Sequence, residues 1–485
     1  MKKIVVLGAG ISGLASATLL AAAGHQVTVL EANSWVGGKS RRIKLAGQRI
    51  DTGPALVTFP EVWGEFLTRF ESLTGKKVSE KDKLEFVKLD EVGRYFFRDE
   101  VTDLPVKKDH KWFPAWKRFE TDHKPLTASI SKLLTASPLN PKALPAVLKM
   151  ALVYGKNLTT ESYLNSLKWL PEGLREVIAI HTLNAGIAPR KTLALYASMT
   201  AAMATEGISV PVGGVNEIPQ SLYRLAKKAG VKVLLNERVT RLEKNRAHTA
   251  TQIFDFDIAV SSLDPQQLDL LLGKKKQMVS KPRSCSGVAI YAVLEKPLPK
   301  GTVTHSVIMP DEPSELYAAL EQFLPPRQTM AFLNYYKPNE IYPNSKPTVA
   351  VLLTAPADGK KYDLESPWVK IEIKRISSLI GLKKPITEMF EDYKILTPKY
   401  FSEWGGYGGA LYGDTRKFWQ SGPFHKPSYV SGSKPWLWRV GASVHPGGGI
   451  PAVLGGSLIV TEQLLRFLES MKSSGDDSSV LVLGS

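Results

Sequence analysis

The feature that most constrains the fold of this chain is a glycine-rich turn close to its start. Lys3 to Leu7 has the apolar run of a buried strand, and Ile11 to Ala23 is a small-residue pattern typical of a helix packed on a sheet. The turn between them is Gly8-Ala9-Gly10-Ile11-Ser12-Gly13. Gly8 permits a tight turn, Gly10 lets a pyrophosphate approach the backbone, and Gly13 lets the helix pack on the strand. The unit predicts a Rossmann-like α/β fold with phosphates at the helix N-terminus.

An acidic residue follows this turn at the distance expected of a dinucleotide site. The next strand, Gln26 to Leu30, ends in Glu31, with Ala32 directly after it. A carboxylate at this place can accept hydrogen bonds from both hydroxyls of a ribose, and it disfavours a 2′-phosphate. Because strand, glycines, helix, second strand and acid occur in order, a glycine turn without a ligand is the weaker interpretation.

Two short motifs indicate FAD rather than NAD. They are Gly37-Gly38-Lys39 and Asp51-Thr52-Gly53-Pro54. They resemble elements of the two-dinucleotide-binding-domain flavoproteins, which include amine oxidases, protoporphyrinogen oxidases and phytoene desaturases. The resemblance implies that Lys39, with Gly38 beside it, meets the FAD phosphates. Lys39 is a point charge where that group more usually carries arginine.

A second glycine-rich turn lies near the far end of the chain. Gly441 to Gly449 (GASVHPGGG) comes before a helical pattern that includes Gly455 to Leu465. Glycines before a helix expose backbone N–H groups, which suit a flavin ring and can stabilise negative charge on its N1/O2 edge. The segment resembles the C-terminal signature of bacterial and fungal phytoene desaturases. The resemblance implies that FAD is contacted here by Gly441, Ala442, Gly449, Ile450, Pro451 and Val453.

Shorter matches to the same family lie between these two turns. Pro211 to Gly214 resembles its P-x-GG turn, and Leu396 to Gly413 resembles the segment before its last FAD-binding stretch. Val231 to Leu242 resembles the strand pair beside the adenine, which implies a backbone contact from Val239. The substrate regions match less well, because Ser209 and Val210 stand where many relatives carry an aromatic residue. The exact carotenoid is therefore left open.

The spacing of the motifs predicts a discontinuous FAD-binding domain. We assign it to residues 1–75, 206–275 and 396–470. Strand-like runs within 276–395 predict an α+β sheet domain that floors a substrate cavity, and 76–205 is predicted to be a mostly helical substrate subdomain. The tail, 471–485, is predicted to be disordered.

One helix of the helical block is a candidate for membrane contact. It would start near Leu144, with Pro145 in its first turn, and place Lys149 and Lys156 on one face. The opposite face would be apolar and carry Leu148, Ala151 and Leu152. One interpretation is an ordinary surface helix with that apolar face in the core, and the other is an interfacial helix that dips into lipid headgroups.

Composition narrows the possible partners. The formal net charge of +17 is compatible with an anionic membrane surface, and no stretch approaches the length of a spanning helix, so we expect a cytoplasmic protein peripherally associated with the inner face of the membrane. Scattered basic residues without a recognisable module argue against nucleic acid, and no metal-ligand spacing is present. The single cysteine, Cys285, suits a reducing compartment.

The resemblance implies the activity of an FAD-dependent carotenoid desaturase. A hydride would pass to flavin N5 from a C–H bond beside an existing double bond of a C40 polyene, and a neighbouring proton would be lost as the new double bond forms. The polyene would be phytoene or a later intermediate, hydroxylated forms included. Such a substrate has no polar handle along its chain, so the protein mainly has to align it in a dry tunnel. The electron acceptor would be oxygen or a quinone. Alternatives are a carotenoid isomerase, an amine-oxidase-like small-molecule oxidase and a noncatalytic carotenoid carrier.

The sequence predicts no catalytic acid–base pair. His445 is the one candidate for proton transfer, because it lies within the second glycine-rich turn, but a histidine that packs to shape this turn is at least as plausible. Glu206 is a second candidate, for which a solvated carboxylate at a helix end is the stronger interpretation.

Overall fold

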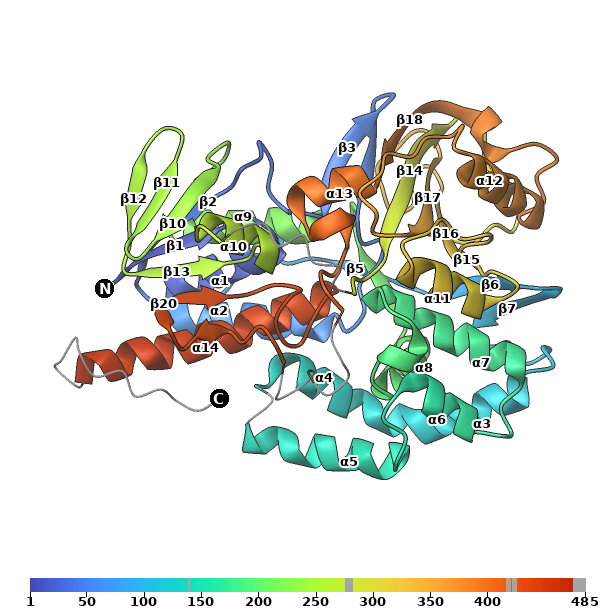
Figure 1. Cartoon of the computed structure of the whole chain (residues 1–485), viewed down its shortest axis with the longest axis horizontal. Helices are drawn as coiled ribbons and strands as arrows, with labels where there is room; N and C mark the ends of the chain where they lie inside the picture. The colour runs from blue at the N-terminus through green and yellow to red at the C-terminus, as the bar shows by residue number, and fades with distance from the viewer. Residues whose placement is uncertain (138–139, 275–281, 416–419, 421–424, 474–485) are drawn as a thin grey trace.

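The computed structural model describes residues 1–485 except 138–139, 275–281, 416–419, 421–424 and 474–485. Figure 1 shows a sheet beside the N-terminus, a second sheet at the upper right, and a group of helices below the second sheet. The mixed α/β architecture agrees with the predicted fold class.

The first sheet is built mainly from parallel strands. In spatial order its strands are β19 (Val430–Ser431), β20 (Lys434–Arg439), β13 (Ile258–Ser261), β1 (Lys3–Leu7), β2 (Gln26–Leu30) and β9 (Lys232–Leu234). Only the edge strand β19 is antiparallel to its neighbour. Three distant parts of the chain therefore meet in one sheet, with the glycine-rich turn after β1 at the carboxyl end of its central strand.

Helix α1 (Ile11–Ala22) lies against this sheet and is almost entirely buried. It packs against α2 (Glu61–Thr74), α9 (Glu217–Lys228) and α14 (Ile450–Ser473). Its small residues allow this close approach on several sides. By length and composition alone α14 could cross a membrane, so the expectation that no stretch approaches that length is wrong; 67% of its apolar window is buried in the fold, as in a core helix.

The second sheet has seven strands. Their order is β18 (Phe390–Leu396), β14 (Ser286–Leu294), β17 (Thr348–Ala355), β16 (Ala331–Tyr336), β15 (His305–Ile308), β6 (Gly93–Phe97) and β7 (Glu100–Leu104). All neighbours are antiparallel except β15 and β6. One face packs on α12 (Pro367–Leu379), through Val369, Ile373 and Ile376.

Residues 76–205 are less purely helical than predicted. Strands β6 and β7 of this block join the seven-stranded sheet, and β5 (Phe86–Leu89) pairs with β8 (Ile208–Pro211). The segment Gly93 to Phe97 alternates between buried and less buried residues, a period of two that favours a strand. The rest of the block is helical: α3 (Phe113–His123), α4 (Thr127–Thr135), α5 (Leu144–Tyr154), α6 (Thr160–Ser166), α7 (Glu172–Ala179) and α8 (Leu195–Glu206).

Smaller elements complete the fold. They are the hairpin β3 (Arg41–Leu45) and β4 (Gln48–Thr52), the antiparallel strands β10 (Val239–Glu243), β11 (Arg246–Thr249) and β12 (Ile253–Asp255), and helices α10 (Pro265–Leu271), α11 (Pro313–Glu321) and α13 (Pro398–Trp404). The exact domain boundaries stay predictions. The start of the tail predicted to be disordered is helical, because α14 continues to Ser473, and residues 474–485 lie outside the described part of the chain.

Helix α5 begins at Leu144, with Pro145 in its first turn, as predicted, but its apolar face does not enter the core. Leu148, Ala151 and Leu152 are all exposed. The helix instead buries Ala146, Met150 and Tyr154. The interpretation of α5 as a surface helix with its leucines in the core is therefore wrong, because smaller and aromatic side chains supply its inner face.

Candidate cofactor and substrate site

The first glycine-rich turn is shaped by close backbone contacts. Gly8 has a φ of +93°, and a Cβ added there would lie 2.7 Å from Ser262 Oγ. A Cβ at Gly13 would lie 2.1 Å from the Gly8 carbonyl oxygen, whereas one at Gly10 would meet nothing within 4 Å. Gly8 and Gly13 thus close the turn, and Gly10 leaves open backbone at the start of α1, where Ile11 and Ser12 form the first helical turn. The geometry fits a phosphate at this N-terminus.

Glu31 supports the turn from the end of β2. Its carboxylate is buried and accepts hydrogen bonds from the Ala9 N–H at 2.7 Å, the Asn33 N–H at 2.9 Å and the Asn33 side-chain amide at 2.7 Å. A carboxylate has about four acceptor positions, so roughly one is left for a ribose hydroxyl. The two ribose contacts predicted for Glu31 therefore compete with the backbone of the turn. Neither protein partner could be read from the motif.

The predicted phosphate-contacting loop packs directly on the turn. The Gly37 N–H donates to the Ala9 carbonyl at 2.8 Å, and a Cβ on Gly38 would lie 3.3 Å from the Gly10 Cα. Lys39 is exposed and donates to the Leu411 carbonyl. Loss of hydration around its ammonium group lowers the pKa of Lys39, while Asp264 opposes the change.

The second glycine-rich turn meets the first. A Cβ on Gly441, whose φ is +101°, would lie 3.1 Å from Ser12 Oγ. The Ser457 hydroxyl of α14 donates to the Ser12 carbonyl at 3.2 Å. Gly441, Ala442 and the helix start that contains Gly449, Ile450, Pro451 and Val453 are thereby brought to α1. A Cβ on Gly449 would meet nothing within 4 Å, so this backbone too is open to a ligand.

Val239 and Ala32 lie on the Glu31 side of the site. Val239 begins β10 and packs beside the core that contains Leu7 and Leu30. The Glu237 N–H donates to the Glu31 carbonyl at 2.8 Å, which ties the approach to β10 to the end of β2. Ala32, the next residue along the chain, is partly buried. Contacts of both residues with a cofactor stay predictions.

Tyr412 closes the second turn on the side of the helical block, and sequence reasoning did not single it out. Its ring is 2.4 Å from the Cβ that a side chain at Gly448 would carry, and 2.8 Å from the one at Gly186. Only glycine fits at either place. Burial raises the pKa of the Tyr412 hydroxyl, so the hydroxyl stays protonated. The resemblance of the segment ending at Gly413 marked this region without revealing the ring's position.

His445 is held in the second turn as a neutral side chain. Burial lowers its pKa to about 4, although the carbonyls of Leu133 and Ala136 act in the opposite direction. A Cβ on Gly456 would lie 3.1 Å from the His445 carbonyl oxygen, so α14 packs closely on this residue. A lowered pKa makes the imidazole a weaker base, and the close packing favours a role in shaping the turn. The other candidate, Glu206, is exposed at the end of α8.

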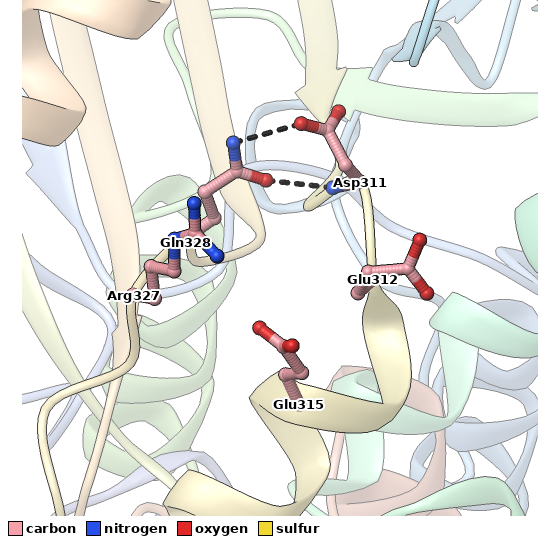
Figure 2. Close-up of a pocket in the computed structure, with 5 residues that line it drawn as sticks. All are labelled: Asp311, Glu312, Glu315, Arg327 and Gln328. Atoms are coloured by element: carbon pink, nitrogen blue, oxygen red, sulfur yellow. Dashed lines mark hydrogen bonds between the residues drawn. The ribbon is translucent and has the colours of Figure 1, made fainter.

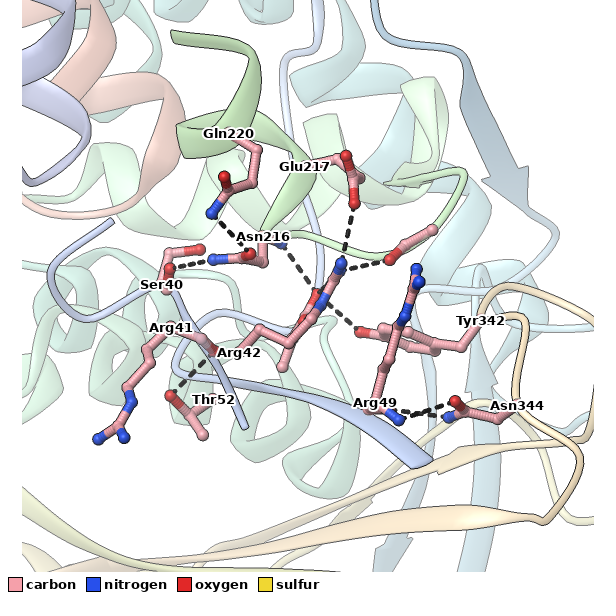
Figure 3. Close-up of polar contacts among 12 residues, drawn as sticks. Ser40, Arg41, Arg42, Arg49, Thr52, Asn216, Glu217, Gln220, Tyr342 and Asn344 are labelled. Carbon is pink, nitrogen blue, oxygen red and sulfur yellow. Dashed lines mark hydrogen bonds and ion pairs between the residues drawn. The ribbon is translucent and has the colours of Figure 1, made fainter. Parts of the chain in front are cut away.

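A buried ion-pair network fixes the β3–β4 hairpin beside the site, as Figure 3 shows. Arg42 binds Asp51 through Nε at 2.6 Å and through Nη2 at 3.1 Å, and it binds Glu217 at 2.8 Å. Asp51 also accepts from the Asn216 N–H at 2.9 Å and from Tyr342 at 3.2 Å. Burial alone would lower the pKa of Arg42, but its contacts with Asp51 and Glu217 outweigh burial and raise the pKa, so the guanidinium stays charged. The network joins the N-terminal hairpin to the turn before α9 and to the loop after β16.

A small charged pocket lies apart from these residues. It measures about 90 Å³ and is lined by Asp311, Glu312, Glu315, Arg327 and Gln328 (Figure 2). None of the predicted cofactor residues lines it. Within the described residues, no group of three or more His, Cys, Asp or Glu side chains could hold a metal ion.

Glu31 hydrogen-bonds to the first glycine-rich turn, and α14 begins directly after the second. Together these two turns define a flavoprotein that binds FAD. The chain belongs to the flavin-containing amine oxidoreductase family, whose pattern matches residues 11–340. It is an FAD-dependent oxidoreductase.

Full-length relatives are carotenoid desaturases. The 4,4′-diapophytoene desaturase (4,4′-diaponeurosporene-forming) of Staphylococcus haemolyticus is 26% identical over 97% of this chain and 100% of its own length. The zeta-carotene-forming phytoene desaturase of Myxococcus xanthus is 24% identical over 96% of this chain and 94% of its own.

Solved structures confirm the fold. A triple mutant of putrescine oxidase superposes with a TM-score of 0.66 at 14% identity, covering 97% of this chain and 99% of that one. A fatty acid isomerase from P. acnes that produces CLA gives a TM-score of 0.57 at 16% identity, covering 96% and 98%. At such identities the likeness describes the fold alone.

Proposed function

We propose that the protein is an FAD-dependent carotenoid desaturase that acts on phytoene or a later intermediate. The observation that carries the proposal is the full-length similarity to two carotenoid desaturases, which extends beyond the FAD-binding part into the substrate part. FAD, when bound, supplies the two-electron acceptor for a hydride taken from the polyene. The electrons would then leave to oxygen or to a membrane quinone.

The protein's own contribution is the placement of an apolar chain. Phe332 of β16 and Leu352 of β17 are paired in register, and both are only partly buried. They lie on the sheet face opposite α12, as expected for the floor of an apolar tunnel. Because burial weakens His445 as a base and its packing favours a role in shaping the turn, alignment of the polyene in a dry site is the means of catalysis that this arrangement supports.

The test is expression in cells that accumulate phytoene, neurosporene or hydroxylated neurosporene, followed by absorption and mass measurement of the pigments. We expect a red-shifted product lighter by a multiple of two hydrogens. The negative control is Gly13→Val, which should lose FAD together with the native fold and leave the pigments unchanged. An isomerised product of unchanged mass would replace this proposal with isomerase activity. FAD retention with no pigment change would indicate a carrier or a non-carotenoid substrate.

We further propose that the protein works at the cytoplasmic face of a membrane and attaches through α5. Leu144, Leu148 and Leu152 follow one another at i, i+4 spacing and are 56%, 56% and 86% exposed. The helix lies at the lower edge of the molecule in Figure 1. Lys142, Lys149 and Lys156 are exposed around it. Apolar side chains flanked by lysines fit the interface of an anionic bilayer, which is also where a lipid-soluble polyene is found.

Co-sedimentation with vesicles tests this attachment. The variant Leu148→Asp/Leu152→Asp should lose most of its binding to vesicles that contain phosphatidylglycerol, while Ile371→Asp on α12, whose parent side chain is 59% exposed, should bind like wild type. Equal losses in both variants would count against α5 as the attachment site. A change of oligomeric state in the α5 variant alone would show that the surface joins two copies of the chain.

A further inference from the structure

Polar side chains adjoin the apolar floor of the seven-stranded sheet. His305 of β15 and Asn334 of β16 lie opposite each other in register, and each is 3% exposed. Phe332 is on the same face as Asn334, because side chains two residues apart on a strand point the same way. The intervening Leu333 packs in the core with α12, on the opposite face. The buried polar pair His305 and Asn334 therefore lies on the same sheet face as the partly buried apolar pair Phe332 and Leu352, two residues further along β16.

His305 has hydrogen-bonding capacity that the protein does not use. Neither ring nitrogen has a well-aligned hydrogen-bond partner among the residues that the structure describes, although the Ala55 carbonyl lies near the ring. Burial lowers the pKa of His305 to about 4, although the nearby Ala55 carbonyl opposes this, so the ring is neutral at pH 7. A neutral imidazole offers one donor and one acceptor. Leaving such a group buried and unpaired costs about 1–3 kcal/mol, so a bound partner would recover free energy.

The neighbours of His305 are engaged elsewhere. The Tyr95 hydroxyl of β6 is 2.8 Å from His181 Nε2, and the Tyr336 hydroxyl donates to the Ala55 carbonyl at 3.3 Å. Gly93 of β6 adds no side chain to this face; a Cβ there would lie 3.2 Å from the His305 carbonyl oxygen. The unmet capacity is therefore specific to His305 and is not shared by the tyrosines around it.

The segment before Ala55 connects this place to the cofactor half. A Cβ on Gly53 would lie 2.3 Å from the Lys39 carbonyl oxygen, and the Gly53 N–H donates to the Tyr291 hydroxyl of β14 at 3.0 Å. Ala55, close behind Gly53 in the chain, reaches Tyr336 and His305. The segment from Gly53 to Ala55 therefore joins the cofactor half to the part of the sheet that carries His305.

We propose that His305, assisted by Asn334, binds a hydroxyl group on an otherwise apolar polyene, while Phe332 and Leu352 contact the hydrocarbon. A hydroxyl both donates and accepts, which matches the donor and the acceptor of a neutral ring and the amide of asparagine. The inference rests on the proposed desaturase function and narrows its substrate to polyenes that carry a hydroxylated end. A site built for a hydroxyl discriminates against the analogue that lacks it.

The test compares a hydroxylated polyene with its parent hydrocarbon on the FAD-loaded protein. Wild type should bind and turn over the hydroxylated polyene more efficiently. His305→Phe keeps an aromatic ring but removes both nitrogens, so kcat/KM for the hydroxylated polyene should fall about tenfold, the loss of one buried hydrogen bond, while the hydrocarbon changes little. Asn334→Leu should give a smaller loss of the same selectivity. His248→Phe, on β11 outside this face, is the matched control.

Binding without turnover separates this inference from the proposed function. The polyene's absorption shift on binding gives a dissociation constant for each ligand even if no desaturation occurs. Selective binding of the hydroxylated polyene that depends on His305, without desaturation, would sink the proposed function and keep this site. Equal losses for both polyenes in His305→Phe would overturn the site and indicate a structural histidine. If that variant does not fold, equal affinity of wild type for the two polyenes would overturn it as well.

Discussion

The molecule has a cofactor half, the six-stranded sheet with α1 and α14, and a substrate half, the seven-stranded sheet with the helical block. At the glycine-rich turns of the cofactor half, backbone atoms pack so closely that a side chain does not fit. In the substrate half, side chains form the packing surfaces. A Cβ at Gly13 would lie 2.1 Å from a backbone oxygen. Phe332 and Leu352 instead stay partly exposed on their sheet face. Backbone geometry therefore determines which cofactor the first half binds, whereas substitutions of side chains in the second half can change which substrate is bound.

The largest effect should follow from filling the closed part of the first turn. Gly13→Val puts a branched side chain where the Gly8 carbonyl lies, so we expect complete loss of FAD and of the native melting transition. The measurements are flavin absorbance after purification and thermal unfolding. Gly64→Ala in α2 is the control, because a Cβ there meets nothing within 4 Å, and it should stabilise the helix by up to about 1 kcal/mol. A yellow Gly13→Val protein would break the comparison.

The second largest effect on stability should come from the Arg42 network, which joins the β3–β4 hairpin to the loop after β16. Arg42→Leu leaves the Asp51 carboxylate, whose side chain is 2% exposed, without its charge partner, and the expected loss is about 3–5 kcal/mol in urea unfolding. Lys370→Gln removes an exposed pair with Glu365 and should cost less than about 1 kcal/mol. If both substitutions had the same small effect, the hairpin would not depend on this network.

The sequence predicted the cofactor half in more detail than the substrate half. The glycine-rich turns, Glu31 and α14 were found because phosphate and flavin sites require glycine at set places, and the same few residues recur wherever that backbone shape is needed. Tyr412 and His305 were missed, because their importance comes from Gly186, Gly448 and Asn334, which only folding brings to them.

The sequence predicted the apolar face of α5 but did not determine whether that face lies in the core or at the surface. Alternation of leucines and lysines is the same for a helix packed in the core and for one at an interface. What decides is that Met150 and Tyr154 take the inward positions, which follows from neighbouring helices and not from α5 itself. Strands β6 and β7 were missed for a related reason, since β15, the strand through which β6 joins the sheet, lies far away in the sequence.

The free energy of unfolding should fall at acidic pH because both halves contain buried histidines. Burial lowers the pKa of His181 and His305 in the substrate half and of His445 in the cofactor half to about 4, below the usual 6.5. The unfolded chain therefore binds protons that the folded protein does not, so stability is full above pH 6.5 and falls as the pH drops toward 4. From pH 7 to 5 we expect a loss of about 2 kcal/mol for each histidine. His305→Phe should lose less stability than wild type over this pH range, and an equal loss would count against His305 as a source of the effect.

The smallest effect on stability should come from the apolar floor, where function and folding separate most clearly. Phe332→Leu keeps an apolar side chain on a partly exposed face, so we expect a cost below about 1.5 kcal/mol and unchanged FAD content. The KM for the polyene should rise a few-fold with little change in kcat, because the contact is made equally in the bound and reacting states. The adjacent Leu333→Met, on the face toward α12, should alter neither constant. A loss of FAD in Phe332→Leu would mean that the two halves are not independent, since the floor would then be shaping the cofactor turns as well as the substrate path.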